Sequence, residues 1–149
     1  MKLKSLLCLA LVLIGATTIF AGQGQPLALR VIAIPFATDV RIKEPFGLTL
    51  RVENPAQTNQ TIRVMSCSWD EEWQSSNTNV TWIQWVCTRN GAMDVTIPPG
   101  GAYTNGLKML IPRPISQKTL SFRMGFTSIG SAGTFWSNEI KLHILPPNK

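Results

Sequence analysis

The feature that most constrains the fold of this chain is the alternation of apolar and polar residues that begins at Leu27. The alternating runs are bounded by Pro, Gly and Asn, and none shows the i, i+3, i+4, i+7 spacing of an amphipathic helix. Successive side chains of a strand point to opposite faces, so each run predicts a strand with one buried face. The expected strands are Leu27–Ile34, Phe46–Val52, Thr61–Trp69, Val80–Thr88, Met93–Ile97, Tyr103–Ile111, Leu120–Phe126 and Phe135–Leu145.

About seven or eight short strands separated by turn residues are typical of an antiparallel β-sandwich. In the number and pattern of its strands, the chain from Leu27 to Leu145 resembles small bacterial immunoglobulin-like domains. The turn Ile97–Gly101 is similar to the proline-glycine turns of exported bacterial sandwich domains. The resemblance implies a fold and no activity. We therefore expect an all-β, antiparallel, immunoglobulin-like β-sandwich in a single domain, residues 25–147, with one disulfide.

The first 21 residues have the pattern of a secretory signal peptide. Lys2 and Lys4 precede an apolar run, Leu6–Ile14, and small residues follow it. Cleavage is expected between Ala21 and Gly24. The run is too short to cross a bilayer, which needs about 20 apolar residues. We expect a soluble protein, secreted or periplasmic, with no membrane span after cleavage.

The cysteines point to the same compartment. Of the three in the chain, Cys8 lies in the predicted signal peptide, so Cys67 and Cys87 remain. In an oxidising compartment these two are expected to pair, although two buried free thiols are the alternative. Their spacing is too short for the inter-sheet disulfide of antibody domains. The bridge is therefore expected to join neighbouring strands or to close a long loop, where it would add about 3 kcal/mol of stability.

The stretch from Cys67 to Cys87, called the Trp-rich segment below, stands out in composition. It holds four of the five tryptophans: Trp69, Trp73, Trp82 and Trp85. Trp82 and Trp85 are three residues apart, so in a strand they would point to opposite faces. At least one tryptophan of this segment is therefore expected to be exposed.

Exposed tryptophans beside acidic residues are typical of a binding surface. A tryptophan offers a large apolar face and one N–H donor, and it is enriched at interface hot spots. Asp70 and Glu71 are expected to accept hydrogen bonds from the bound molecule. The alternative is that the tryptophans pack around the disulfide as core residues and that Asp70–Glu72 is a solvated turn.

Several function classes are disfavoured. The net charge of +6 comes from scattered basic residues without a basic run, so nucleic-acid binding is not expected. His143 is the only histidine, and its place in a predicted strand indicates an exposed position. The chain has no Gly-x-Ser-x-Gly turn, no metal-ligand set and no phosphate or dinucleotide motif, so we expect neither catalysis, metal nor cofactor. The alternation places Met93, Met109 and Met124 in the core.

The sequence thus predicts a non-catalytic protein-interaction module that uses the Trp-rich segment or an exposed sheet edge. The alternatives are a carbohydrate-binding module, with Trp69, Trp73 or Trp82 as its stacking platform, and a small secreted hydrolase. The partner, protein or glycan, is not identified by the sequence. A coplanar row of exposed tryptophan faces would favour a sugar ligand, whereas a single protruding tryptophan with an apolar rim would favour a protein.

Overall fold

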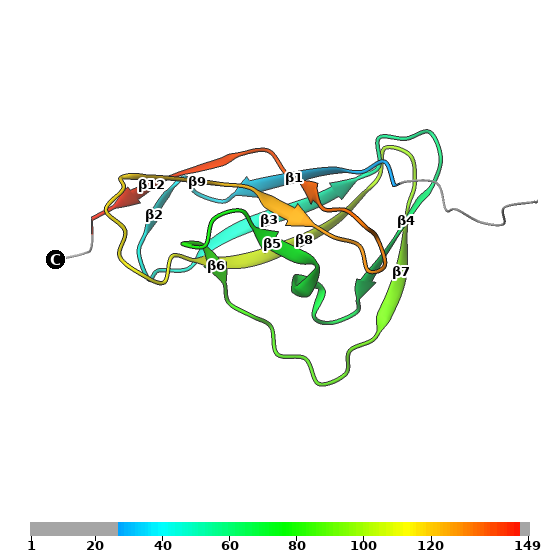
Figure 1. Ribbon diagram of the computed structural model, residues 1–149, viewed down its shortest axis with the longest axis horizontal. Coiled ribbons are helices and arrows are strands. Elements are labelled where there is room, and N and C mark those ends of the chain that lie inside the picture. Colours follow the sequence, from blue (N-terminus) through cyan, green and yellow to red (C-terminus); the bar gives the residue numbers. More distant parts are fainter. Residues whose placement is uncertain (1–26, 147–149) are drawn as a thin grey trace, which may run out of the picture.

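The computed structural model describes residues 27–146, which contain twelve strands and one short 3-10 helix (Figure 1). The predicted signal peptide and residue 147, the expected end of the domain, lie outside the described residues. The elements are β1 (Arg30–Pro35), β2 (Asp39–Arg41), β3 (Phe46–Glu53), β4 (Gln60–Met65), η1 (Trp69–Glu72), β5 (Trp73–Ser75), β6 (Thr81–Trp82), β7 (Ala92–Ile97), β8 (Ala102–Leu110), β9 (Thr119–Phe122), β10 (Met124–Phe126), β11 (Phe135–Trp136) and β12 (Ile140–Leu145). Among these elements, no helix is long and apolar enough to cross a membrane.

The strands pair in four sheets. The largest has the order β1-β3-β8-β6, and the others are β11-β10-β5, β2-β12-β9 and the pair β4-β7. All pairings between the described strands are antiparallel except that of β2 with β12, which is parallel. The expected all-β fold with antiparallel sheets is therefore confirmed, whereas the number of strands is larger than expected.

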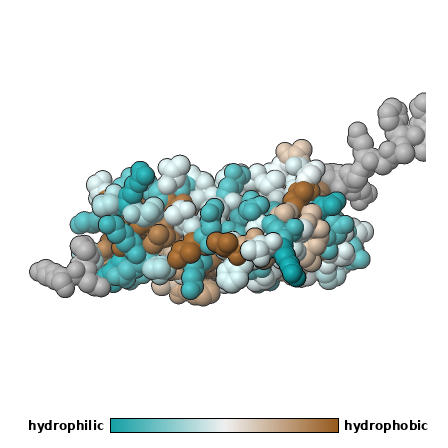
Figure 2. Space-filling view, turned by 90° about the horizontal axis from the view of Figure 1, so that it is seen from below, coloured by the Kyte–Doolittle hydropathy of each residue, from teal (hydrophilic) through white to brown (hydrophobic). Residues whose placement is uncertain are grey.

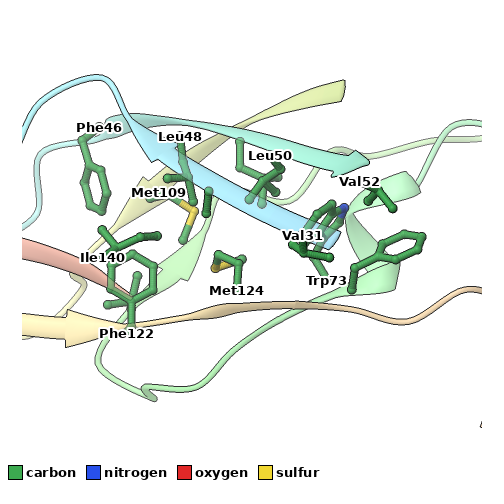
Figure 3. Close-up of a cluster of buried hydrophobic side chains, with 14 of the residues drawn as sticks. Val31, Phe46, Leu48, Leu50, Val52, Trp73, Met109, Phe122, Met124 and Ile140 are labelled. Atoms are coloured by element: carbon green, nitrogen blue, oxygen red, sulfur yellow. The ribbon is translucent and has the colours of Figure 1, made fainter. Parts of the chain in front are cut away.

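The hydrophobic core lies between two layers of strands (Figure 3). Alternate residues of β3 are buried and the residues between them are half-buried, as the alternation predicts. The side chains from the β1-β3-β8 layer include Val31, Phe46, Leu48, Leu50, Val52 and Met109. Those facing them from β5, β9, β10 and β12 are Trp73, Phe122, Met124 and Ile140.

Two predicted strands are each broken into two. The run Leu120–Phe126 is interrupted at Arg123, and the last run is interrupted at residues 137–139. The second interruption contains polar side chains that form hydrogen bonds of their own. The Ser137 hydroxyl accepts from the Met124 N–H at 3.0 Å. The Asn138 side chain accepts from the Ala33 N–H at 2.9 Å and donates to the Ala33 carbonyl at 3.1 Å, which joins the second layer to β1.

The predicted strand Val80–Thr88 is the largest departure. Only Thr81 and Trp82 pair with β8, and the chain then leaves the sheet as a long loop that returns at β7 (Figure 1). The reason is that Cys87 is bonded to Cys67, which follows β4, so the chain turns away from β8 to reach that bond.

The core prediction for the methionines holds for Met109 and Met124, which are fully buried, and is wrong for Met93. Met93 is 46% exposed. Its pairing partner Val64 is buried, but Met93 lies near the end of β7, the other strand of this two-stranded sheet.

A buried asparagine fixes the turn between β7 and β8. The Asn54 side chain donates to the carbonyls of Thr58 and Ile97, both at 2.8 Å, and accepts from the Ala56 N–H at 2.9 Å. Gly100 of this turn has a φ of 71°, a backbone conformation that glycine adopts at little cost. Every polar group of the Asn54 side chain thus has a partner.

Candidate functional site

The disulfide closes the base of the Trp-rich segment. Cys67 and Cys87 are bonded, with 5.9 Å between their Cα atoms, which confirms the predicted pairing. They lie just beyond the β4-β7 pair, which ends at Met65 and Ala92. Of the two arrangements expected for the bridge, the structure therefore has the one in which it closes a long loop. The Asn90 side chain accepts from the Cys67 N–H at 3.3 Å and holds the loop to the same base.

The four tryptophans of this segment have different environments. Trp73, the first residue of β5, is only 4% exposed and its ring lies 5.2 Å from that of Phe126, centroid to centroid. The expectation that Trp73 contributes a stacking face is therefore wrong, since it is part of the core. Trp69 and Trp82 are half-buried, whereas Trp85 is 67% exposed.

The exposed apolar surface around Trp85 is contributed by its neighbours. Ile83 and Val86 are 50% and 88% exposed, and both lie in the loop that follows β6. Figure 2, which shows the molecule from below the view of Figure 1, has apolar patches among hydrophilic side chains on this face. Trp85 thus protrudes with an apolar rim.

The two acidic residues predicted for the site occupy opposite environments. Asp70, in η1, is only 4% exposed, and its Oδ2 accepts from the Trp82 indole N–H at 3.3 Å. The other oxygen, Oδ1, is buried without a hydrogen-bond partner among the described residues. Glu71 is exposed. A buried polar atom without a partner costs about 1–3 kcal/mol, so Asp70 is held in an unfavourable environment.

Glu72, the third residue of the acidic run, is a second buried carboxyl group. Its Oε1 accepts from the Met65 N–H at 3.0 Å, and its Oε2 has no partner among the described residues. Burial raises the pKa of Glu72 above its ordinary value, against the opposing effect of the Met65 hydrogen bond. Burial also raises the pKa of the Tyr103 hydroxyl, and the negative charge of Glu72 adds to that effect.

A groove of about 500 Å³ runs along this region. It is lined by Trp69, Asp70, Ile83, Gln84, Trp85, Gly106, Leu107 and Lys108. A second hollow, of about 380 Å³, shares three of these residues, Gly106 to Lys108, and continues to Phe36 on the other side of β8. The Phe36 ring lies on Gly47, where any Cβ would overlap with it. A Cβ at Gly106 would meet only the Leu48 carbonyl, at 4.0 Å, so the floor of the groove is open there.

The backbone groups of β8 alternate in direction. The Phe36 N–H donates to the Gly47 carbonyl at 3.0 Å, so the backbone groups of Gly47 point to the β1 side. In an antiparallel ladder the direction alternates from residue to residue, so the groups of Leu48 point to β8, where they face Leu107. The N–H and C=O groups of Leu107 and of every second residue from it therefore bond β3.

The backbone N–H and C=O groups of the intervening residues of β8 point away from β3. The Lys108 carbonyl confirms this direction, because it accepts from the Ile83 N–H at 2.8 Å. Since β6 ends at Trp82, the pairing stops there. Within residues 27–146, no hydrogen bond from another segment reaches the backbone of Thr104 or Gly106 on this side. These backbone groups are called the open edge of β8 below.

The sequence predicts an exposed sheet edge as one possible binding surface, but sequence reasoning missed its place at β8, the role of Gly106 and the burial of Asp70. A glycine inside an alternating strand run was a usable signal for Gly106, because such a glycine often marks close approach of another group. The other expected features lie outside this region. His143 is exposed, with its Nδ1 3.6 Å from Asp39. No cluster of three potential metal-ligating side chains occurs in the part of the chain described here.

Comparisons with known proteins give no family. No family model matches the chain, and a search of curated proteins found no significant match. The groove and the open edge are therefore the features from which a function is inferred.

Proposed function

We propose that this chain is an exported, non-catalytic protein-interaction module that binds an extended segment of a partner protein as an added strand. The observation that carries the proposal is the open edge of β8, where the N–H and C=O groups of Thr104 and Gly106 have no partner among residues 27–146 and lie beside an apolar groove. Unpaired strand edges of this kind template the addition of an extended chain.

The groove supports the same occupant. A strand added at Gly106 would place alternate side chains over the groove, because side chains of a strand alternate between its faces. Trp85 and Ile83 would then be covered from solvent. Burial of apolar area contributes about 25 cal/mol per Å², so covering one tryptophan is a substantial share of the affinity of a short peptide.

The arrangement of the tryptophans favours a protein partner over a glycan. Of the four in the Trp-rich segment, only Trp85 is more than half exposed, and it has an apolar rim. A sugar-binding platform would need several exposed faces in one plane, whereas Trp73 is in the core.

Export and an immunoglobulin-like sandwich belong to the same proposal. The Cys67–Cys87 disulfide is compatible with an oxidising compartment, and the leader pattern supports secretion or a periplasmic location. The short antiparallel strands and the core between two layers support a sandwich of this class.

The test is selection of random peptides on the oxidised protein, followed by affinity measurement with variants. We expect enriched peptides whose affinity falls at least about tenfold, about 1.4 kcal/mol, in Gly106→Pro, because proline removes the N–H at the open edge. The fold is expected to persist, since that N–H does not bond β3 and proline is tolerated at strand edges. Trp136→Ala, at an exposed tryptophan on β11, is the matched control and should retain the affinity.

Two outcomes would contradict the proposal. One is the failure of any peptide to be enriched. The other is a set of peptides that bind Gly106→Pro as tightly as the unchanged protein. Binding of glycans that is lost in Trp85→Ala and retained in Gly106→Pro would instead support the carbohydrate-binding alternative.

A further inference from the structure

We infer that the groove beside the open edge is a subsite for a cation, and that the bound segment places an arginine or lysine side chain there, with its charge toward Asp70. The inference rests on the proposed function, because it names the side chain that the bound segment carries. It begins from a conflict in the structure: Asp70 is a carboxylate that is almost fully buried, yet half of its hydrogen-bonding capacity is unused.

The position of Asp70 shows where a donor would come from. Asp70 is part of the lining of the groove, together with Trp69 and Trp85. Its Oδ2 is held by the Trp82 indole N–H at 3.3 Å, which fixes the orientation of the carboxylate. The remaining oxygen, Oδ1, has no partner in residues 27–146. The carboxylate is therefore already oriented, and Oδ1, which has almost no accessible surface, would be reached from the groove once the lining shifts around an entering side chain.

The charges around Asp70 favour a cationic donor over a neutral one. Glu71 and Glu72 follow it in η1, so its neighbours in the chain are acidic, although of the three only Asp70 lines the groove. Lys108 also lines the groove, but it forms no ion pair with any described carboxylate. Asp70 is thus not neutralised within the described part of the protein, although Lys108 would oppose an incoming positive charge.

The other residues that line the groove favour a side-chain cation over a metal ion as its ligand. A metal ion needs several ligands, and no cluster of three His, Cys, Asp or Glu side chains occurs in the described residues. A guanidinium or ammonium group needs one carboxylate and is attracted to the faces of tryptophan rings. Trp69 and Trp85 supply such rings in the same groove. The aliphatic stem of the side chain would cover apolar surface, while its head reaches Asp70.

The subsite is tested without any partner protein, by titration of the oxidised protein with N-acetyl-arginine N-methylamide. The readout is the set of tryptophan indole N–H signals in a two-dimensional NMR spectrum. We expect saturable shifts for the Trp82 and Trp85 signals, at millimolar concentrations, and at least about fivefold weaker binding of the norleucine analogue, which has no charge.

Two variants locate the cation. Asp70→Asn keeps an acceptor for the Trp82 indole and is expected to weaken arginine-amide binding at least about fivefold. Glu71→Gln, which removes the same charge at the neighbouring exposed residue, is the matched control and should weaken it less. Trp85→Ala provides a second variant, should Asp70→Asn alter the fold. Equal binding of the two amides, or arginine binding that neither Asp70→Asn nor Trp85→Ala weakens, would overturn the inference.

The peptide selection separates this inference from the proposed function. Peptides that depend on Gly106 but show no preference for arginine or lysine would support strand addition and overturn the cation subsite. A saturable, Asp70-dependent titration without any selected peptide would support the subsite and contradict strand addition. Failure of both experiments would contradict both proposals.

Discussion

The core between the two layers and the Trp-rich segment are built from similar residues but differ in how completely their groups are satisfied. Around Leu48 and Phe126, apolar side chains are fully buried, and the buried Asn54 uses all of its side-chain hydrogen-bonding groups. In the Trp-rich segment, Asp70 is buried with an unpartnered oxygen, and Trp85 is exposed.

The comparison teaches that stability and binding capacity are located in different parts of this molecule. Groups that are already satisfied gain little from a partner, whereas an unpartnered carboxylate oxygen, an exposed tryptophan and an open strand edge all gain from one. Four substitution experiments test this division, and they are given in order of the expected effect.

The largest effect is expected for Phe126→Ala. Phe126 is fully buried against Trp73, so its truncation removes apolar contacts and leaves a cavity, at a cost of about 3–5 kcal/mol in the free energy of unfolding. Urea denaturation measures this loss. The control is Trp85→Ala, which should change stability by no more than about 0.5 kcal/mol. Equal losses in the two variants would remove the distinction between the regions.

The double variant Cys67→Ser, Cys87→Ser is expected to lose about 3 kcal/mol, because the disulfide closes a loop with a sequence separation of 20 residues. Its effect on tryptophan exposure is expected to be local. Iodide quenching should increase for the half-buried Trp69 and Trp82, while Trp73, whose ring is in the core, remains shielded. Quenching that is unchanged after removal of the bridge would show that the segment keeps its shape without it.

The two buried polar residues provide the third experiment. Asn54→Ala removes hydrogen bonds to Thr58, Ile97 and Ala56, and it should cost about 2–3 kcal/mol. Asp70→Asn should cost less than about 1 kcal/mol or be neutral, because it removes an unpartnered buried charge and keeps an acceptor. Thermal denaturation compares them, and a larger loss for Asp70→Asn would contradict the comparison.

The smallest effect is expected for Glu72→Gln. Burial raises the pKa of Glu72, so the folded state binds its proton more tightly than the unfolded chain does. The contribution of Glu72 to stability is therefore largest below the ordinary value of 4.5, and it falls as the pH rises through the raised pKa.

Glutamine does not titrate, so it avoids the loss of stability that Glu72 causes above its raised pKa. Its side-chain carbonyl still accepts from the Met65 N–H. We expect Glu72→Gln to raise the free energy of unfolding slightly at pH 7 and to have little effect near pH 4. Denaturation curves between pH 4 and pH 8 measure the difference. A constant difference across this range would show that the titration of Glu72 does not contribute.

The same division explains what could be predicted from the sequence. The alternation predicts the burial of β3 and of Leu120, Phe122, Met124 and Phe126, because a strand covered on one face needs that period. The disulfide follows from two cysteines in a chain with a leader pattern. These features depend on local pattern and residue count alone.

The candidate site depends on pairings between distant segments, and for this reason the sequence predicted it only in part. The sequence predicts that both Trp85 and Trp73 take part in binding. Trp85 is exposed, whereas β5 places Trp73 in the core. The burial of Asp70 in η1 and the early end of β6 follow from the position of the disulfide. The open edge at Gly106 exists only because β6 is short, and no local pattern predicts that length.

The Asn138 amide has a consequence for strand register. Sliding β1 by two residues would leave the same side chains facing the core, so the hydrophobic pattern alone discriminates weakly between such alignments. Asn138 both accepts from the N–H and donates to the carbonyl of Ala33. A slide that brought Pro35 to the place of Ala33 would lose the first of these bonds, because proline has no N–H. A single side chain from the second layer thus disfavours one of the shifted alignments that bury equivalent surface.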